Sequence, residues 1–193
     1  DLPSKDKRRL FKENLHVMRD AWAGKSLCEG DSIVLAPLPL QKPHPPIWVA
    51  AFGPLALQQV GSLGLPYLAS PIESLSTLTE NYGVYNRCVT EAGHASVKTV
   101  PIMRTIFVTS DPALARSVKA ALAASVPAQM KDKAKNIDDW AIVGDQTYVK
   151  DKLAQYVETL GLSHLIVRGR LGKVDVAVQQ RSLLSILEIA ARL

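Results

Sequence analysis

The chain has 193 residues, of which 47% are hydrophobic and 21% charged, a balance that excludes a disordered chain and fits one globular domain. Its net charge is +5, and no apolar stretch approaches the ~18 residues of a membrane span, so we expect no membrane association. Part of the charge is a local run of cations, Lys5, Lys7, Arg8, Arg9 and Lys12. No interleaved aromatic residues accompany this run, so we interpret it as the solvated face of a helix and expect no nucleic-acid partner.

The first residues, 1–5, contain no apolar segment of the kind that a secretory signal needs. The two cysteines, Cys28 and Cys88, are far apart in the sequence, and neither they nor the four histidines have the spacing of metal ligands. Free thiols are typical of a reducing compartment, although a disulfide is also compatible with these positions. We therefore expect a cytoplasmic protein without a metal.

The chain begins with a segment that precedes any strand. Apolar residues at three- and four-residue steps predict an amphipathic helix over 5–23, which ends at Gly24. The following residues, 25–45, predict an irregular, proline-rich connector, because each proline disfavours helix in the residue before it.

Residues 46–193 alternate between strands and helices. The predicted strands are 46–51, 66–69, 100–109 and 163–168, and the predicted helices are 54–63, 73–92, one beginning at Asp111-Pro112, 146–160 and 176–192. A less regular segment is inserted near 126–144. The strands are continuous apolar runs, which are typical of a parallel sheet covered on both faces, so we predict four parallel strands in sequential order.

The turn after the first strand has the features of an anion site. The strand ends at Gly53, and Pro54 stands in the first turn of the next helix. The first N–H groups of a helix have no internal partner, and the helix dipole is positive there. A tight turn that simply needs glycine is the alternative. If an anion binds, we expect a bulky β-branched residue at position 53 to weaken binding with little unfolding.

Five segments, taken in order, resemble the bacterial-luciferase-like flavin-dependent monooxygenases. They are Met18–Gly24, Gln41–Ala51, Gly64–Pro66, Trp140–Asp145 and Gly161–Ile166. The resemblance covers nearly the whole chain and implies a partial TIM barrel, the last four βα units of a luciferase-like (β/α)8 barrel. Residues 1–193 would then form a single half-barrel domain, with 1–24 as the leading helix, 25–45 as the connector and 46–193 as the four units.

The resemblance also implies an activity and a cofactor. The complete enzyme would use reduced FMN and O2 to oxygenate a small organic substrate, with the flavin at the carboxyl ends of the strands. A close variant of the family uses a deazaflavin for hydride transfer instead, and the residues of this chain do not separate the two. Because the family's first four strands are missing from this sequence, a non-catalytic half-barrel that binds a ligand or associates with itself is a second hypothesis. A complete doubly wound α/β domain is a third.

Two sets of residues are candidates for the site. The resemblance assigns the flavin phosphate to the corner formed by Phe52, Gly53, Pro54, Leu55 and Ala56, where only backbone N–H groups are offered. Candidates for a substrate or an anion are Glu73, Arg104, Arg168 and Arg170.

Each of these four has a structural alternative. Glu73 could be a carboxylate in the first turn of a helix. Arg104 lies inside an apolar strand and could point into the barrel or outward to pair with a carboxylate between helices. Arg168 and Arg170 could be solvated. Finally, open sheet edges and an uncovered apolar face predict a homodimer or higher oligomer.

Overall fold

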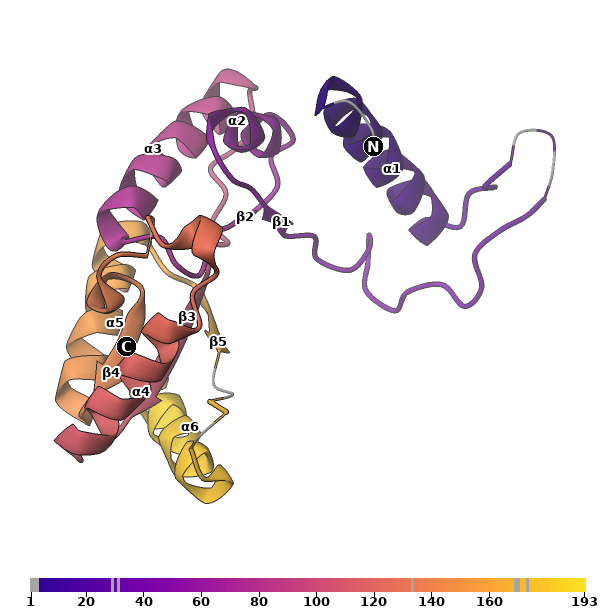
Figure 1. The fold of residues 1–193 in the computed structure, drawn as a ribbon. Coiled ribbons are helices and arrows are strands. Elements are labelled where there is room, and N and C mark those ends of the chain that lie inside the picture. Colours follow the sequence, from indigo (N-terminus) through magenta and orange to yellow (C-terminus); the bar gives the residue numbers. More distant parts are fainter. Residues whose placement is uncertain (1–3, 29, 31, 133, 169–170, 173) are drawn as a thin grey trace. The chain divides into compact units, whose positions relative to one another are not determined.

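The computed structural model describes residues 4–28, 30, 32–132, 134–168, 171–172 and 174–193. These residues form two compact units, 1–47 and 48–193. In the first unit, the helix α1 (Ser4–Trp22) confirms the predicted leading helix (Figure 1). The described residues of the connector form no helix or strand, and the ring of His44 lies against that of Trp22, with 5.8 Å between the ring centroids.

The second unit alternates strands and helices, as predicted. Its elements in chain order are β1 (Val49–Ala50), α2 (Pro54–Ser62), β2 (Tyr67–Leu68), α3 (Leu75–Glu91), β3 (Pro101–Val108), α4 (Pro112–Ala124), the short 3-10 turns Ala128–Met130 and Ile137–Asp139, β4 (Ala141–Gly144), α5 (Gln146–Leu160), β5 (His164–Arg168) and α6 (Val176–Ala190). Asp111 and Asp145 cap α4 and α5 as their positions predict, since each carboxylate accepts backbone N–H groups of the first turn.

The strands form two parallel sheets. β1 pairs with β2, and β3 lies between β4 and β5 in a three-stranded sheet. The expected order therefore holds for the neighbours β1–β2 and β3–β5. The prediction that residues 141–144 belong to an irregular insertion is wrong, because they form the strand β4. This run is too short to give a strand signal, and it becomes a strand only by pairing with Thr105–Val108 at the edge of β3.

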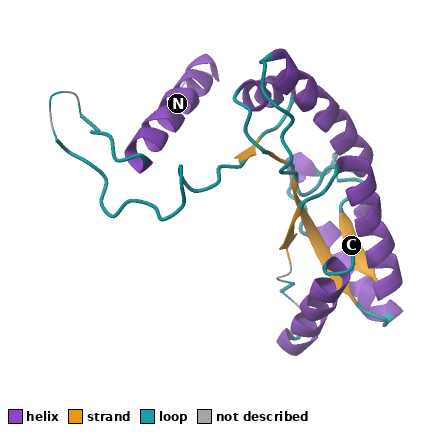
Figure 2. Cartoon of the chain, turned by 180° about the vertical axis from the view of Figure 1, so that it is seen from behind, coloured by secondary structure: helices purple, strands orange, loops and turns teal. Residues whose placement is uncertain are grey.

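The alternation of side chains gives each sheet an outer and an inner face. On β1 and β2, Val49 and Tyr67 are buried, and Tyr67 packs against Tyr82 and Tyr85 of α3. On β3, Arg104 points toward Tyr156 of α5. We call this helix-covered side the outer face, and α3 and α5 lie along it in both views (Figures 1 and 2).

The inner face carries the alternate residues of the strands. Ala50 and Leu68 are register partners on β1 and β2, and Met103 and Ile166 are partners on β3 and β5. All four are exposed or partly exposed, and the strand neighbours of Ala50, Leu68 and Met103 are buried. Near its carboxyl end, β3 is covered on this side by α4.

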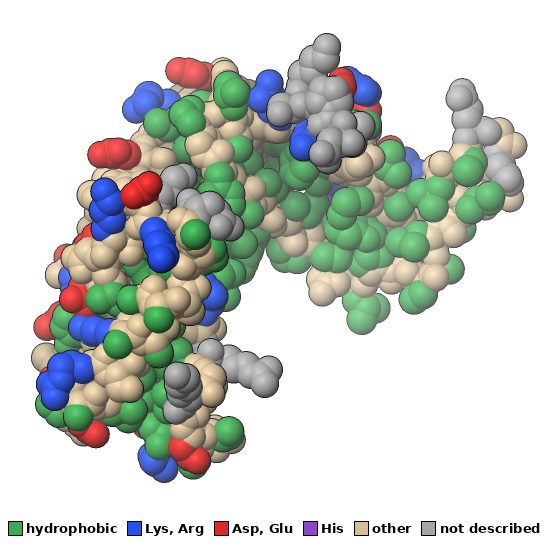
Figure 3. Space-filling model, viewed as in Figure 1, with side chains coloured by type: hydrophobic (Ala, Val, Ile, Leu, Met, Phe, Trp, Pro, Cys, Tyr) green, Lys and Arg blue, Asp and Glu red, His purple; other side chains and the backbone are tan. Residues whose placement is uncertain are grey.

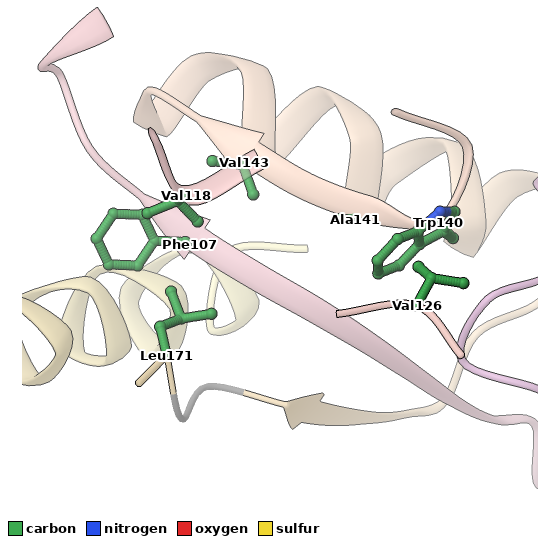
Figure 4. Packing of buried hydrophobic residues seen from close by; sticks show 7 residues of the cluster. All are labelled: Phe107, Val118, Val126, Trp140, Ala141, Val143 and Leu171. Atoms are coloured by element: carbon green, nitrogen blue, oxygen red, sulfur yellow. The ribbon is translucent and has the colours of Figure 1, made fainter. Parts of the chain in front are cut away.

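A separate apolar core holds α4 in that position. Phe107 of β3 and Val143 of β4 are register partners, so their side chains share one face of the sheet. Both belong to a buried cluster with Val118 of α4 and Trp140, to which Val126, Ala141 and Leu171 also belong (Figure 4). The inserted segment before β4 is thus attached to the sheet through its own packing.

A close approach of two helices joins α2 to α3. Gly61 of α2 is buried, and a Cβ atom built there would lie 2.6 Å from Cβ of Cys88 and 2.9 Å from the carbonyl oxygen of Tyr85. Only glycine allows this spacing, which fixes α2 and therefore the position of its amino terminus.

Candidate functional site

The corner between β1 and α2 has the geometry of an open anion cradle. Gly53 has φ 79° and ψ 169°, a region that glycine alone adopts readily, and it precedes Pro54 at the start of α2. The Gly53 carbonyl accepts the N–H of Leu57 at 3.1 Å. The N–H groups of Leu55 and Ala56 come before the first intrahelical donor, so they remain free for a ligand.

The surroundings of the corner are accessible. The side chains of Phe52 and Leu55 are 54% and 59% exposed, and a Cβ atom built on Gly53 would meet nothing within 4 Å. No side chain caps this helix end. The corner is therefore open to solvent, and its backbone N–H groups are accessible to a small anion such as phosphate.

Arg104 adopts the outward orientation of the two that the sequence allows. Its residue exposure is 0%, and its Nε donates to the hydroxyl of Tyr156 at 2.8 Å. Its Nη1 donates to the carbonyls of Ser70 at 3.0 Å and Met103 at 2.9 Å, and its Nη2 donates to the carbonyl of Glu73 at 2.6 Å. The guanidinium carbon also lies 5.1 Å from the centroid of the Tyr156 ring. These partners satisfy a charge that would otherwise be costly to bury.

Glu73 is buried next to this arginine. It stands just before Ser74, whose hydroxyl accepts the Thr77 N–H and caps α3, so Glu73 lies outside the first turn in which we expected it. Its carboxylate accepts a hydrogen bond of 3.3 Å from Nδ2 of Asn81 in α3. The structure thus brings the candidates Glu73 and Arg104 together on the outer face.

Arg168 lies on the opposite side of the sheet. It is exposed at the carboxyl end of β5 and is the register partner of Thr105. Because successive residues of a strand alternate, this register places Arg168 on the inner face and Arg104 on the outer face. Arg170 lies outside the described residues.

Two features of the site were not anticipated from the sequence. Tyr156 belongs to the buried stripe Val149, Leu153 and Tyr156 of α5, whose spacing gives a helix-face signal but not a partner for its hydroxyl. The carbonyls of Ser70 and Glu73 are backbone acceptors, and no sequence pattern identifies them as ligands of an arginine.

Burial favours the neutral form of three tyrosines, Tyr67 of β2 and Tyr82 and Tyr85 of α3. The hydroxyls of Tyr82 and Tyr85 donate to the carbonyls of Tyr67 and Leu65 at 2.9 and 2.7 Å, which ties α3 to β2. Burial raises the pKa of Tyr85 to about 12, and it raises the pKa of Tyr82 further. Burial and then the nearby charge of Glu73 raise the pKa of Tyr67 as well.

Parallel strands joined by outer helices define a segment of a β/α barrel. Comparison of the sequence with known protein families supports the same fold. The family model of luciferase-like monooxygenases matches residues 2–163. The chain therefore belongs to the luciferase-like monooxygenase family and has the fold of a partial luciferase-like barrel. No curated protein matches the chain.

Solved structures share this fold at low sequence identity. The monooxygenase RslO1 from Streptomyces bottropensis superposes with a TM-score of 0.75 at 18% identity, covering 99% of this chain and 63% of that one. The oxygenating constituent of 3,6-diketocamphane monooxygenase from Pseudomonas putida, in complex with FMN, gives a TM-score of 0.65 at 17% identity, with 91% and 60% covered.

A third structure extends the likeness to deazaflavin enzymes. An F420-dependent secondary alcohol dehydrogenase, in complex with an F420-acetone adduct, has a TM-score of 0.66 at 15% identity, with 86% and 58% covered. The present chain spans about three-fifths of the length of these three proteins. Identities this low establish the fold alone.

Proposed function

We propose that this chain supplies the carboxyl-terminal half of a flavin-binding barrel that oxygenates a small organic substrate with reduced FMN and O2. The observation that carries the proposal is the corner at Phe52–Ala56, where a glycine-only turn opens a helix with free N–H groups at the carboxyl end of a barrel strand. In a barrel of this class, the carboxyl ends of the strands form the active face.

The residues present fit the phosphate of a flavin. The N–H groups of Gly53, Leu55 and Ala56 would hold the phosphate, and the exposed Phe52 would lie beside the ring system. Arg168, on the inner face, is a second cation for an anionic group of cofactor or substrate. The flavin, when bound, supplies the redox chemistry, while this chain's residues orient it and limit the access of water.

A deazaflavin is the second candidate cofactor. The FMN complex of the diketocamphane enzyme and the F420 complex of the alcohol dehydrogenase share this fold, so both cofactor classes are compatible with it. With a deazaflavin, the reaction would be hydride transfer rather than oxygenation. A non-catalytic, ligand-binding half-barrel is the remaining alternative, because this chain spans only part of its relatives.

Three further properties belong to the proposal. We expect the protein to work in the cytoplasm, and no helix among the described residues is long and apolar enough to cross a membrane. On the face of the second unit seen in Figure 3, acidic and basic side chains are interspersed, and we expect no nucleic-acid partner. We also expect a homodimer or higher oligomer, in which a second copy covers the inner face.

Titration of the purified chain with flavins tests the proposal. We expect FMN fluorescence to be quenched on binding, and we expect riboflavin, which lacks the phosphate, to bind about tenfold or more weakly. Equal affinities for FMN and riboflavin would show that the corner holds no phosphate. An F420-type deazaflavin, titrated in the same way, decides between the two cofactor classes.

A further inference from the structure

The two sheets of the second unit are not joined by a backbone ladder. Among the described residues, β1 pairs only with β2, and β3 pairs with β4 and β5, although β2 and β3 lie next to each other. At the edge of β3, the inserted strand β4 occupies the positions opposite Thr105–Val108. The segment that follows β2 must therefore be held against β3 in some other way.

Arg104 makes this connection from β3. It is the residue immediately before the stretch paired with β4, and its guanidinium reaches the carbonyls of Ser70 and Glu73 in the segment that follows β2. The same side chain donates to Tyr156 of α5. Hydrogen bonds from a charged donor are stronger than neutral ones, and the planar guanidinium directs several of them at once. One side chain thus ties the segment 70–74, the strand β3 and the helix α5 together.

The segment that Arg104 holds is adjacent to the corner proposed for the flavin phosphate. Ala50 and Leu68 are register partners in neighbouring strands, and the corner, which begins at Phe52, and the held segment, which begins at Ser70, each start two residues after this pair. A shift of the segment 70–74 would therefore disturb the strand next to the one that leads into the corner.

We infer that Arg104 is a positioning residue of the cofactor site, which acts by fixing the segment 70–74 at the carboxyl end of β2. This inference rests on the proposed flavin function. Arg104 itself is fully buried on the outer face, so it would act through this segment and not on the cofactor directly. A lysine at this position would keep the charge but would lack the planar fork that reaches the carbonyls of Ser70 and Glu73 and the hydroxyl of Tyr156 together.

Two variants separate this role from general stability. Arg104→Lys removes the bridging geometry to Ser70 and Glu73. Tyr156→Phe is the matched control, because it removes the hydrogen bond on the α5 side and leaves both carbonyl contacts in place. Each variant is compared with the parent chain for its urea midpoint, for hydrogen–deuterium exchange of peptides covering 66–78, and for its affinity for FMN.

We expect both variants to lower the urea midpoint, but only Arg104→Lys to speed exchange in 66–78 and to weaken FMN binding about tenfold or more. An Arg104→Lys variant that binds FMN as well as Tyr156→Phe does would overturn the inference. If the parent chain itself binds no flavin, the proposed function fails, and with it the link to a cofactor. Exchange in 66–78 then still decides whether Arg104 fixes this segment, and unchanged exchange in Arg104→Lys would refute that as well.

Discussion

Thr105 and Arg168 are register partners on β3 and β5, so the two side chains share the inner face of the sheet. Arg104, the sequence neighbour of Thr105, points to the outer face and is fully buried there. The two arginines therefore have different environments on opposite faces of the sheet. Arg168 is exposed at the carboxyl end of its strand, where a ligand can reach it.

Replacing Arg168 tests its role toward an anion. We expect Arg168→Gln to weaken FMN binding about threefold to tenfold, because an exposed cation near an anionic group contributes on the order of 1 kcal/mol. The urea midpoint should not change, since the side chain is exposed. Arg116→Gln, an exposed arginine of α4, is the control and should leave the affinity for FMN unaltered. Equal affinities for both variants would remove Arg168 from the site.

Substitution of Gly53 tests the corner itself. We expect a β-branched residue to weaken binding with little global unfolding, although the φ of 79° adds a strain of about 1–3 kcal/mol for any side chain there. Gly53→Ala is the matched control, as it carries the same strain with a single methyl group. We predict that both variants lose similar stability, and that Gly53→Val binds FMN more weakly than Gly53→Ala in fluorescence titrations. Equal binding by the two variants would argue against a ligand at this turn.

The cluster around Phe107 predicts a large effect on stability. Phe107 is buried between β3, β4 and α4, so Phe107→Ala should lower the free energy of unfolding by about 3–5 kcal/mol through lost burial and a residual cavity. Urea denaturation at an unchanged m value measures this effect. Leu184→Ala, at a position on α6 that is 60% exposed, should stay within about 0.5 kcal/mol of the parent chain. A small loss in Phe107→Ala would mean that the cluster does not hold the insertion.

The buried tyrosines predict a loss of stability in alkali. The pKa of Tyr85 is about 12 in the folded chain, against 10.0 for a free tyrosine, because burial disfavours the phenolate. The neutral form is bound more tightly by the fold, so this contribution is complete below pH 10 and disappears as the pH rises from 10 to about 12. Urea unfolding at a series of pH values measures the decline. Tyr85→Phe, which keeps the ring but cannot ionise, should show a shallower decline over this range.

Light scattering at micromolar concentration tests the association. β1 and β5 each pair on one side only among the described strands, and the inner face presents partly exposed apolar residues such as Leu68 and Met103. Open edges and apolar faces of this kind favour pairing with a second chain. We expect a mass of two or more copies of the 21.0 kDa chain. A sharp, stable monomer peak would contradict this expectation.

Local chemistry let the sequence predict most elements of the fold. Asp145 and Gly161 mark the two ends of α5, because a carboxylate can cap the first turn and glycine adopts the left-handed conformation at the last, with φ 70°. Gly53 and Pro54 likewise mark the turn into α2. The continuous apolar runs of β3 and β5 predicted neighbouring parallel strands. These signals reside in a few adjacent residues, so no knowledge of distant contacts was needed.

Tertiary structure alone decided which side chains meet. β4 is a strand only because the edge of β3 offers hydrogen bonds to residues 141–144. Its run of three apolar residues is too short to predict a strand from the sequence. The direction of Arg104 depends on which face of β3 the helices cover, and its partners come from Ser70, Glu73 and Tyr156, up to 52 residues away. These distant acceptors set the energy of the buried charge. The sequence therefore predicts that Arg104 needs partners, but it does not identify them.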